Sequence, residues 1–350
     1  MSGTPVYPGG SNTFIPNHRA TSNLVIGFSR NQSDFAINEY ISLKPVDQDQ
    51  GRYLRITTEE AGRILDSELS EFVWPDGADR PMNNDGTELF SFDGYRTKRY
   101  DFGYKLGKKS SEQAEWDIGK SHQAIKAQQA MTGRTVRVHS VLASASSWEA
   151  NHRKDVSTIT GNSGPWDVST TVRQDIKRSL NHAAEQIMLS TLSVVKKKDL
   201  RLVLSPPTAH RISECQEIVD HIKGSPEAYS QVRGGTGRWS EWGLPNELYG
   251  FKIVVEDAAK VTSRRGAATS TRQFVMPAGV AYLMSRPGGL VAPAGDGPNF
   301  STISYFAYEE MTVEEFDDTK NRRLEGHVVD DGVPVQTASV SGFKFEGITS

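Results

Sequence analysis

The pattern of apolar and polar positions is most informative between Leu89 and Leu142. Aromatic residues recur there at mostly even spacing around the dipeptide Asp93-Gly94: Phe90, Phe92, Tyr95, Tyr100, Phe102 and Tyr104. A period of two is typical of a β-strand, and Asp-Gly favours the positive φ angles of a tight turn. The pattern therefore predicts a two-stranded aromatic hairpin over residues 86–109. A ribbon of this size is marginal alone in water, so we expect it to pack against another chain.

A helical pattern follows this hairpin without a break. Ser110 and Gln113 form a capping box, and the positions behind it recur at helical spacing: Ala114, Ile118, Ser121, Ile125 and Gln128. At 1.5 Å per residue, a helix from Ser110 to Thr132 would be about 34 Å long. Its apolar stripe is narrow and broken by polar side chains. This indicates a helix that lies along a sheet and meets something outside the subunit with its other flank.

The remaining segments predict an α+β chain. Residues 1–50 are rich in Gly, Pro, Ser and Asn and predict an extended arm, whereas alternation over residues 134–160 predicts long strands beside the helix. A second unit follows, with a capping box at Thr171 and Gln174 before an amphipathic helix. Strands and helices then occur in mixed order, which is typical of the α+β class. The tail from His327 alternates around an Asp-Gly turn, and we expect it to return to the sheet of the first unit.

Length and composition place the chain among soluble globular proteins. Its 350 residues, 36% apolar and 24% charged, suggest two or three compact units. No apolar run approaches the roughly 18 residues of a membrane span, and the N-terminus lacks the basic start and apolar core of a signal peptide. We therefore expect a soluble protein made in a cytoplasm. The single cysteine, Cys215, excludes an intrachain disulfide and a Cys-based zinc cage, and we predict an inert thiol.

Charge is spread unevenly along the chain, although the net charge is only −3. Residues 91–110 carry six basic and two acidic side chains, and residues 307–331 carry nine acidic and three basic ones. The candidate acidic partners in the second segment are Glu309, Glu310, Glu314, Glu315, Asp317 and Asp318. Two interpretations stay open: two solvated surfaces, or a basic hairpin of one copy that lies on the acidic strand of its neighbour and sets its register.

One motif of enzyme chemistry matches on paper. The segment Ala114–Ser121, AEWDIGKS, fits a relaxed phosphate-loop pattern, in which glycine amides curl round phosphate between a strand and a helix. Here the segment lies inside the predicted helix and Asp117 would repel phosphate, so a helix is favoured over a nucleotide-binding enzyme. The histidines are scattered, and the glycines at 234, 235 and 237 predict a surface loop. We therefore predict no catalytic, cofactor-binding or metal site.

The order of these segments resembles the major capsid proteins of tailed double-stranded DNA bacteriophages, which share the Hong Kong 97-like fold. The resemblance covers about residues 55–345 and rests on successive segments: VWPDGADRP, KRYDFGYKLGKKSSEQAEWDI, DLRLVLSPPTAHRI, GLPNELYGFKIVVEDA and QFVMPAGVAYLMSRPGG. It implies an α+β fold with an N-arm, an E-loop hairpin, a long spine helix with a peripheral-domain sheet, and a mixed α+β axial domain. The implied ranges are 1–50 for the N-arm, 51–85 for a strand and turn segment joining the peripheral domain, 86–109 for the E-loop, 110–165 for the spine helix (110–132) and peripheral strands, 166–312 for the axial domain, and 313–350 for the return to the peripheral domain.

The resemblance also implies a function. It is that of a structural protein, not an enzyme and without a cofactor, which assembles as hexamers and pentamers into an icosahedral shell around double-stranded DNA. The implied partners are a separate scaffolding protein, a portal protein and packaged DNA bound non-specifically, with no membrane. The implied location is the virion capsid, assembled in the host bacterial cytoplasm. Encapsulin compartments share this fold and are the alternative within it, but the long polar arm favours the virus.

The E-loop hairpin is the contact between subunits that the resemblance implies. The residues expected to make it are Phe92, Tyr95, Arg96, Lys98, Arg99, Tyr100, Phe102 and Lys105. Some relatives crosslink a hairpin lysine to a neighbour's asparagine with a glutamate as base, and the candidates for this are Lys98 or Lys105, Asn321 and Glu315. Reinforcement by interlocking arms and hairpins, or by a decoration protein, is favoured over such a crosslink.

Overall fold

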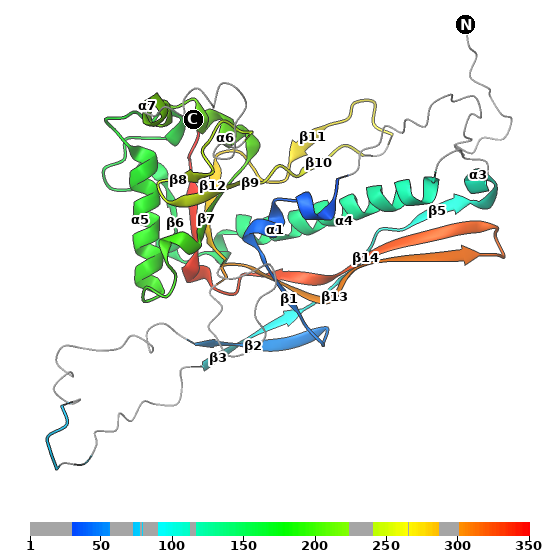
Figure 1. The fold of residues 1–350 in the computed structure, drawn as a ribbon, viewed down its shortest axis with the longest axis horizontal. Coiled ribbons are helices and arrows are strands. Elements are labelled where there is room, and N and C mark those ends of the chain that lie inside the picture. Colours follow the sequence, from blue (N-terminus) through cyan, green and yellow to red (C-terminus); the bar gives the residue numbers. More distant parts are fainter. Residues whose placement is uncertain are drawn as a thin grey trace, which may run out of the picture. The chain divides into compact units, whose positions relative to one another are not determined.

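The structure is a computed structural model, and the residues it describes are 30–56, 73–77, 79, 90–112, 117–223, 241–264, 266–286 and 301–350. The chain divides into two compact units. Unit 1 combines Met1–Asp34, Arg99–Met131 and Met311–Asp330, and unit 2 combines Phe35–Lys98, Thr132–Glu310 and Asp331–Ser350. Three long elements contribute residues to both units: α4 (Ile118–Ala143), β13 (Ser304–Asp318) and β14 (Arg323–Val335) (Figure 1).

Unit 2 is built on a six-stranded sheet in the order β6-β15-β12-β7-β9-β8. Its strands are β6 (Arg153–Asp155), β7 (Leu200–Leu204), β8 (Glu247–Leu248), β9 (Phe251–Val255), β12 (Val280–Ser285) and β15 (Phe343–Glu346). β7 pairs with β9, and β6 with β15, in parallel, while the other neighbours are antiparallel. This mixture confirms the predicted α+β class. A separate two-stranded sheet joins β10 (Ala259–Val261) to β11 (Arg272–Phe274).

Helix α5 (Asp175–Ser190) supplies the largest apolar stripe of this unit. Ile176, Leu180 and Ile187 follow one another at helical spacing and are fully buried in one core with Trp166 and Phe343. Each such aliphatic side chain stabilises the fold by about 1.5–3 kcal/mol. Two shorter helices follow, α6 (Pro206–Ser213) and α7 (Gln216–Lys223). α6 begins at Pro206, because a proline in the first turn of a helix loses no backbone hydrogen bond.

The predicted capping box of α5 is wrong. Gln174 adopts a left-handed backbone conformation with φ 49°, makes no side-chain cap, and precedes a helix that begins at Asp175. The hydroxyl of Thr171 instead donates to Asp220 on α7. The motif therefore matched in sequence, but neither side chain caps the helix.

The aromatic segment is not one hairpin. β3 (Phe90–Arg96) runs straight through Asp93-Gly94 and pairs antiparallel with β2 (Gln50–Ile56), so the predicted turn is wrong. The seven residue pairs of this ladder outweigh the turn preference of one dipeptide. β4 (Arg99–Asp101) and β5 (Tyr104–Gly107) belong to a different sheet, in which both pair with β14.

The end of the predicted arm is folded. α1 (Ile37–Tyr40) and β1 (Ser42–Pro45) lie within residues 1–50, and β1 pairs in parallel with β13. Ile37 and Tyr40 are fully buried, so apolar side chains in this polar segment are enough to fold it onto unit 2. Residues 1–29 of the predicted arm lie outside the described residues.

The long helix is present, but its bounds differ from the prediction. α3 (Lys108–Glu112) is a separate short helix, residues 113–116 lie outside the described part, and α4 extends to Ala143. Residues 134–143, predicted as strand, are therefore helical. Val138 and Leu142 alternate with polar residues, but they are also spaced by four and are both buried, which satisfies a helix equally well.

The tail follows the prediction only in part. β14 pairs with β13 but runs through Asp331-Gly332 without a turn, and β15 joins the six-stranded sheet of unit 2. A Cβ at Gly332 would lie 2.4 Å from the Tyr305 ring, so the glycine makes room for a cross-strand aromatic side chain.

Candidate functional site

The predicted contact residues on β3 have different surroundings. The Tyr95 ring stacks on Phe306 with centroids 4.6 Å apart, and it lies over Gly51, where a Cβ would be 2.6 Å from the Tyr95 hydroxyl. Tyr95 is therefore committed to contacts within its own chain. Phe92, with 62% of its surface exposed, and Arg96 face solvent from the same strand. An exposed phenylalanine beside a cation is a surface that a partner could cover.

The remaining predicted contact residues lie at and beyond β4. Lys98 and Arg99 are exposed, and Tyr100 and Phe102 are half-buried. Lys105 on β5 lies opposite Glu325 on β14, with 3.4 Å between its Nζ and the carboxylate. Lys105 is thus already paired within unit 1, and with none of the six predicted acids.

The aromatic ring of Tyr104 connects strands β5 and β14 to the first half of α4. Tyr104 of β5 lies opposite Gly326 of β14, where a Cβ would come within 2.2 Å of the ring. The same ring stacks on His122 of α4, with centroids 5.5 Å apart. Burial raises the pKa of Tyr104 and lowers that of His122. The predicted arrangement of a helix along a sheet is confirmed here.

The predicted acidic residues lie along β13 as expected. Glu314, Glu315 and Asp317 are exposed, whereas Glu309 is half-buried and the side chain of Glu310 lies outside the description. Phe316, 55% exposed, lies among them. Asp318 ends the strand and accepts hydrogen bonds from the side-chain amide (2.6 Å) and backbone amide of Asn321, which hold its pKa below the usual range.

The crosslink candidates are occupied within the chain. The Asn321 side chain is bound to Asp318, and Lys105 is paired with Glu325. Glu315 lies close to the start of α4, 3.6 Å from where a Cβ of Gly119 would be. Lys98 is exposed. A bond between copies thus stays a prediction and would require Asn321 to leave its present partner.

The phosphate-loop match is not borne out by the local geometry. Residues 114–116 lie outside the description, but Asp117 caps α4 by accepting a hydrogen bond from the Lys120 amide at 2.9 Å. Its carboxylate also lies 3.3 Å from the Lys120 ammonium. That backbone hydrogen bond is the main reason the pKa of Asp117 is lowered. The amide and the lysine that would meet a phosphate are therefore both satisfied by the protein's own anion.

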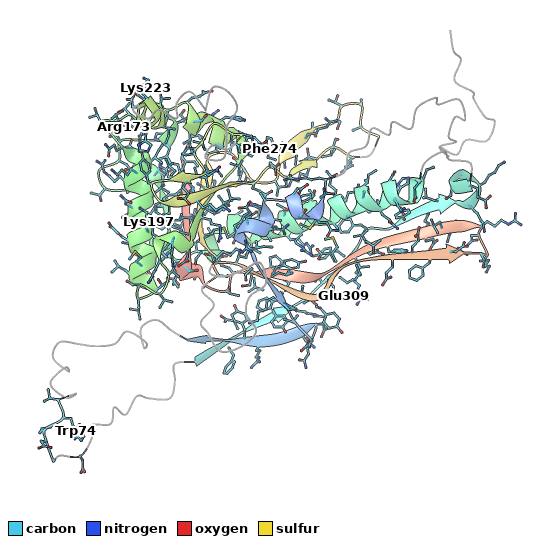
Figure 2. All side chains as sticks on the ribbon, in the orientation of Figure 1. Trp74, Arg173, Lys197, Lys223, Phe274 and Glu309 are labelled. Atoms are coloured by element: carbon cyan, nitrogen blue, oxygen red, sulfur yellow. The ribbon has the colours of Figure 1, made fainter. Side chains whose placement is uncertain are left out.

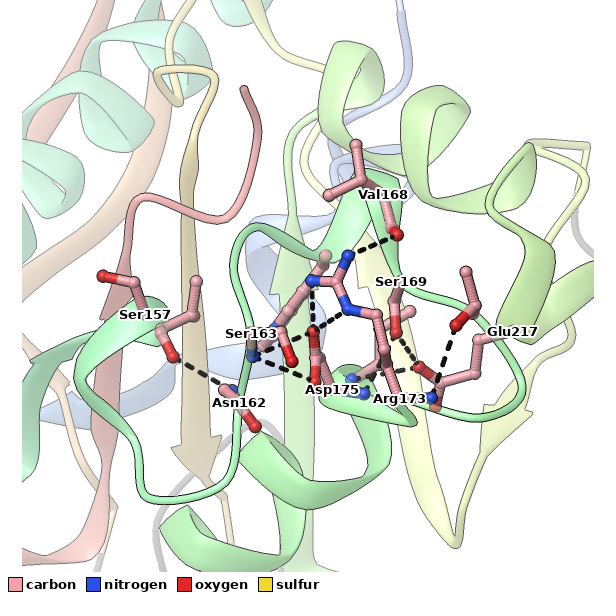
Figure 3. Close-up of polar contacts among 12 residues, drawn as sticks. Ser157, Asn162, Ser163, Val168, Ser169, Arg173, Asp175 and Glu217 are labelled. Atoms are coloured by element: carbon pink, nitrogen blue, oxygen red, sulfur yellow. Dashed lines mark hydrogen bonds and ion pairs between the residues drawn. The ribbon is translucent and has the colours of Figure 1, made fainter.

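A buried polar cluster that the sequence did not reveal fixes the start of α5 (Figure 3). The Glu217 carboxylate of α7 accepts hydrogen bonds from the backbone amides of Ile176 and Lys177, both at 3.1 Å. It also accepts from the hydroxyls of Ser169 and Tyr249. Burial, followed by this hydrogen bond, raises the pKa of Tyr249 well above its usual range. Glu217 thus caps α5 from another helix.

A second carboxylate completes the cluster. Asp175 is fully buried and pairs with the Arg173 guanidinium, with 2.6 Å between Nη2 and Oδ2 (Figure 3). It also accepts from the backbone amide of Ser163. Because each oxygen is satisfied by a neighbour, the cluster has the character of a structural support, not of a catalytic pair. Its members are distant in sequence, so no spacing could have indicated it.

A further buried chain of hydrogen bonds holds α1 in unit 2. The Tyr40 hydroxyl donates to Glu256 at 2.6 Å and lies 2.9 Å from His139 Nε2. Since the hydroxyl proton is directed at Glu256, His139 donates to the Tyr40 oxygen. Burial raises the pKa of Tyr40 and lowers that of His139 to about 4. His139 is therefore a neutral structural histidine.

The described ranges contain no group of three or more His, Cys, Asp or Glu side chains able to hold a metal ion. Burial raises the pKa of the Cys215 thiol to about 11, which confirms that it is inert at neutral pH. Among the helices that can be described, none has the length and apolar character needed to cross a membrane.

Comparisons with known proteins give matches in structure only. No model of a protein family matches the sequence, and no curated protein does. A phage-related protein from Bordetella bronchiseptica is similar in structure, with a TM-score of 0.59, 16% identity, and coverage of 91% of this chain and 94% of that one. A chain of the bacteriophage PhiM1 mature capsid gives a TM-score of 0.52 at 12% identity, covering 95% and 92%. The capsid of the native GTA particle gives 0.51 at 9% identity over 100% of both chains. The chain therefore has the α+β fold of phage capsid proteins, as the resemblance predicted.

Proposed function

We propose that this chain is a major capsid protein, which assembles into an icosahedral shell enclosing the double-stranded DNA genome of a tailed phage. The observation that carries the proposal is the shared fold over nine tenths or more of both this chain and capsid chains such as that of PhiM1. Coverage of this extent leaves little of the chain for an added catalytic domain. The proposed role is therefore structural, and the proposed location is the virion capsid.

Self-assembly is further supported by a surface that one chain leaves exposed. β2 and β3 form a sheet of only two strands, which ring stacking of Tyr53 and Tyr95 attaches to Phe306 of the same chain. On its surface Phe92 and Arg96 face solvent, and Lys98 and Arg99 extend the positive charge. We propose that this β2–β3 ribbon contacts a neighbouring copy, on the acidic part of β13 that carries Glu314, Glu315 and Asp317.

The proposed partners follow from the same function. Copies of the chain form hexamers and pentamers, and a separate scaffolding protein directs their curvature in the host bacterial cytoplasm. A portal protein occupies one vertex, and double-stranded DNA fills the shell. Interlocking copies or a decoration protein reinforce the shell; the Lys98 or Lys105 to Asn321 crosslink is a further route.

Electron microscopy of the purified full-length protein tests the proposal. We expect uniform shells or rings on co-expression with the scaffolding gene. Discrete particles under about 100 kDa, at any concentration, would contradict a shell protein. To separate a virus from an encapsulin, particles from infected or induced cells are treated with nuclease and their contents analysed. Protected genome-length DNA supports the phage capsid, and an enzyme cargo without DNA supports the compartment.

A further inference from the structure

A group of cations lies on and beside α5 in unit 2. We define the α5 basic surface by its residues: Lys154, Lys177, Arg178, Lys196, Lys197 and Lys198. Lys154 on β6 lies along one flank of the helix, where its Nζ is 3.2 Å from His182 Nε2. Lys197 lies along the other flank, 3.4 Å from the Asn181 side chain (Figure 2). Lys154 and Lys197 therefore contact consecutive residues of the helix, His182 and Asn181.

The lysines of this surface have no carboxylate partner in the described part of the chain. Lys154 and Lys197 contact neutral groups, and Lys197 and Lys177 also lie over the rings of Phe251 and Tyr249. Arg178 is the exception, at 3.8 Å from Asp175, a carboxylate already paired with Arg173. By contrast, carboxylates lie within 4 Å of five described lysines elsewhere: Lys105, Lys120, Lys223, Lys252 and Lys344.

Positive charge exceeds negative charge on this surface. Residues 175–199 contain five Lys or Arg residues and three acids, of which Asp175 is buried and paired with Arg173. Burial, and then the neighbouring Lys154 ammonium, lower the pKa of His182. Like charges held together without counterions repel one another, so an anion that bound across them would be favoured.

We propose that the α5 basic surface binds the phosphate backbone of double-stranded DNA without reading its sequence. The inference rests on the proposed function, in which DNA is the cargo. Five of the six cations are lysines, point charges suited to phosphate in any orientation. The nearby rings of Tyr249 and Phe251 are covered by Lys177 and Lys197, so they cannot stack on exposed bases. Because proteins that bind single strands use such stacking, the surface favours a duplex.

The salt dependence of DNA binding tests this inference on the unassembled full-length chain. A labelled 20-base-pair duplex is titrated with wild type and with a variant carrying Lys154→Gln, Lys177→Gln, Lys197→Gln and Lys198→Gln. Each lost phosphate contact lowers the slope of log affinity against log salt by about 0.9, so we expect a decrease of about three to four. The matched control replaces four carboxylate-paired lysines by Gln: Lys105, Lys120, Lys223 and Lys252. It makes the same change in net charge, and its slope should fall by one or less.

Three results would overturn the inference. One is an unchanged slope in the α5 variant while its circular dichroism and melting match wild type. Another is an equal fall in the control, which would mean that only net charge matters. The third is displacement of the duplex by a peptide of residues 309–318 at equimolar amounts, which would assign the surface to an acidic segment of a second copy. Shell formation is scored separately by electron microscopy. Wild-type shells with an unchanged slope refute this inference alone, whereas a lower slope without wild-type shells refutes the proposed function alone.

Discussion

At the scale of single residues, burial decides protonation in this chain. His139 is 3% exposed and has Tyr40 as its hydrogen-bond partner, so its pKa is lowered to about 4. The pKa values of His122, His152 and His182 are also lowered, first of all by burial. His152 is hydrogen-bonded to the Ser190 hydroxyl and the Gly342 carbonyl, and His122 stacks on Tyr104, so these histidines are accounted for by packing or hydrogen bonding.

The lowered pKa of His139 predicts acid sensitivity. The unfolded chain binds a proton at this residue near pH 6.5 and the folded chain only near pH 4, so stability falls as pH decreases through this window. The loss from this one residue is about 3 kcal/mol. Urea unfolding at pH 7 and pH 4.5 measures it. His139→Gln should lower stability at pH 7 but should show a smaller decrease towards pH 4.5. An identical pH dependence in wild type and variant would show that another group is responsible.

At the scale of elements, the ends of helices depend on distant side chains. α5 begins after a left-handed Gln174 that provides no cap, and Glu217 from α7 binds its first free amides instead. A helix terminus leaves amides that must be satisfied, and here tertiary structure satisfies them. Sequence motifs record only local caps, which explains why the Thr171 and Gln174 match was misleading.

Removal of this tertiary cap should destabilise unit 2. Glu217→Ala leaves two helix amides and two hydroxyls without their acceptor, which costs about 3–5 kcal/mol by the usual penalty for buried unpaired groups. Glu217→Gln keeps one acceptor oxygen and should cost less than half as much. Thermal melting of both variants measures the difference. Thr171→Ala, which removes only the exposed hydrogen bond to Asp220, is the control and should cost about 1 kcal/mol. An effect of Thr171→Ala as large as that of Glu217→Ala would show that Glu217 is not the main cap of α5.

Helices and strands were predictable from the sequence where the spacing of the buried apolar residues fits only one type of element. The stripe of α5 is a single period over four turns, and the prediction is confirmed there. In α4, the residues Val138 and Leu142 fit both a period of two and a spacing of four, so periodicity alone could not assign residues 134–143. At β3, the turn preference of Asp93-Gly94 was overridden by pairing with β2, a partner about 40 residues away that local reasoning did not consider.

At the scale of the whole molecule, the fold was predictable from the order of the segments in the sequence. Which residues of those segments are exposed on the surface was not predictable. The basic and acidic segments were both found in the sequence. The structure adds that Tyr95 and Lys105 are engaged within the chain, whereas Phe92, Arg96 and Lys98 are exposed on the basic side. Some aromatic and basic side chains of this segment therefore pack within the chain and others are exposed. Only the three-dimensional structure distinguishes the two groups.

Charge reversal tests the proposed docking between copies. In Arg96→Glu/Lys98→Glu/Arg99→Glu, the ribbon meets Glu314, Glu315 and Asp317 of its neighbour with like charge, so assembly yield should fall severalfold at low salt. Because salt screens exposed charges, wild-type assembly should weaken from 50 to 500 mM salt while that of the variant should not. Sedimentation and electron microscopy measure both.

A compensating change makes this test specific. The substitutions Glu314→Lys, Glu315→Lys and Asp317→Lys are added to the charge-reversed ribbon variant. They restore the attraction between the two surfaces and should recover much of the assembly yield. Reversal of three basic residues on the β10–β11 sheet and the segment that connects its strands, Lys260, Arg264 and Arg272, is the matched control and should leave assembly unchanged. If the ribbon variant assembles with wild-type yield and salt dependence, the two surfaces do not meet in the shell. The acidic face of β13 would then be a solvated surface, the simpler interpretation of its charge.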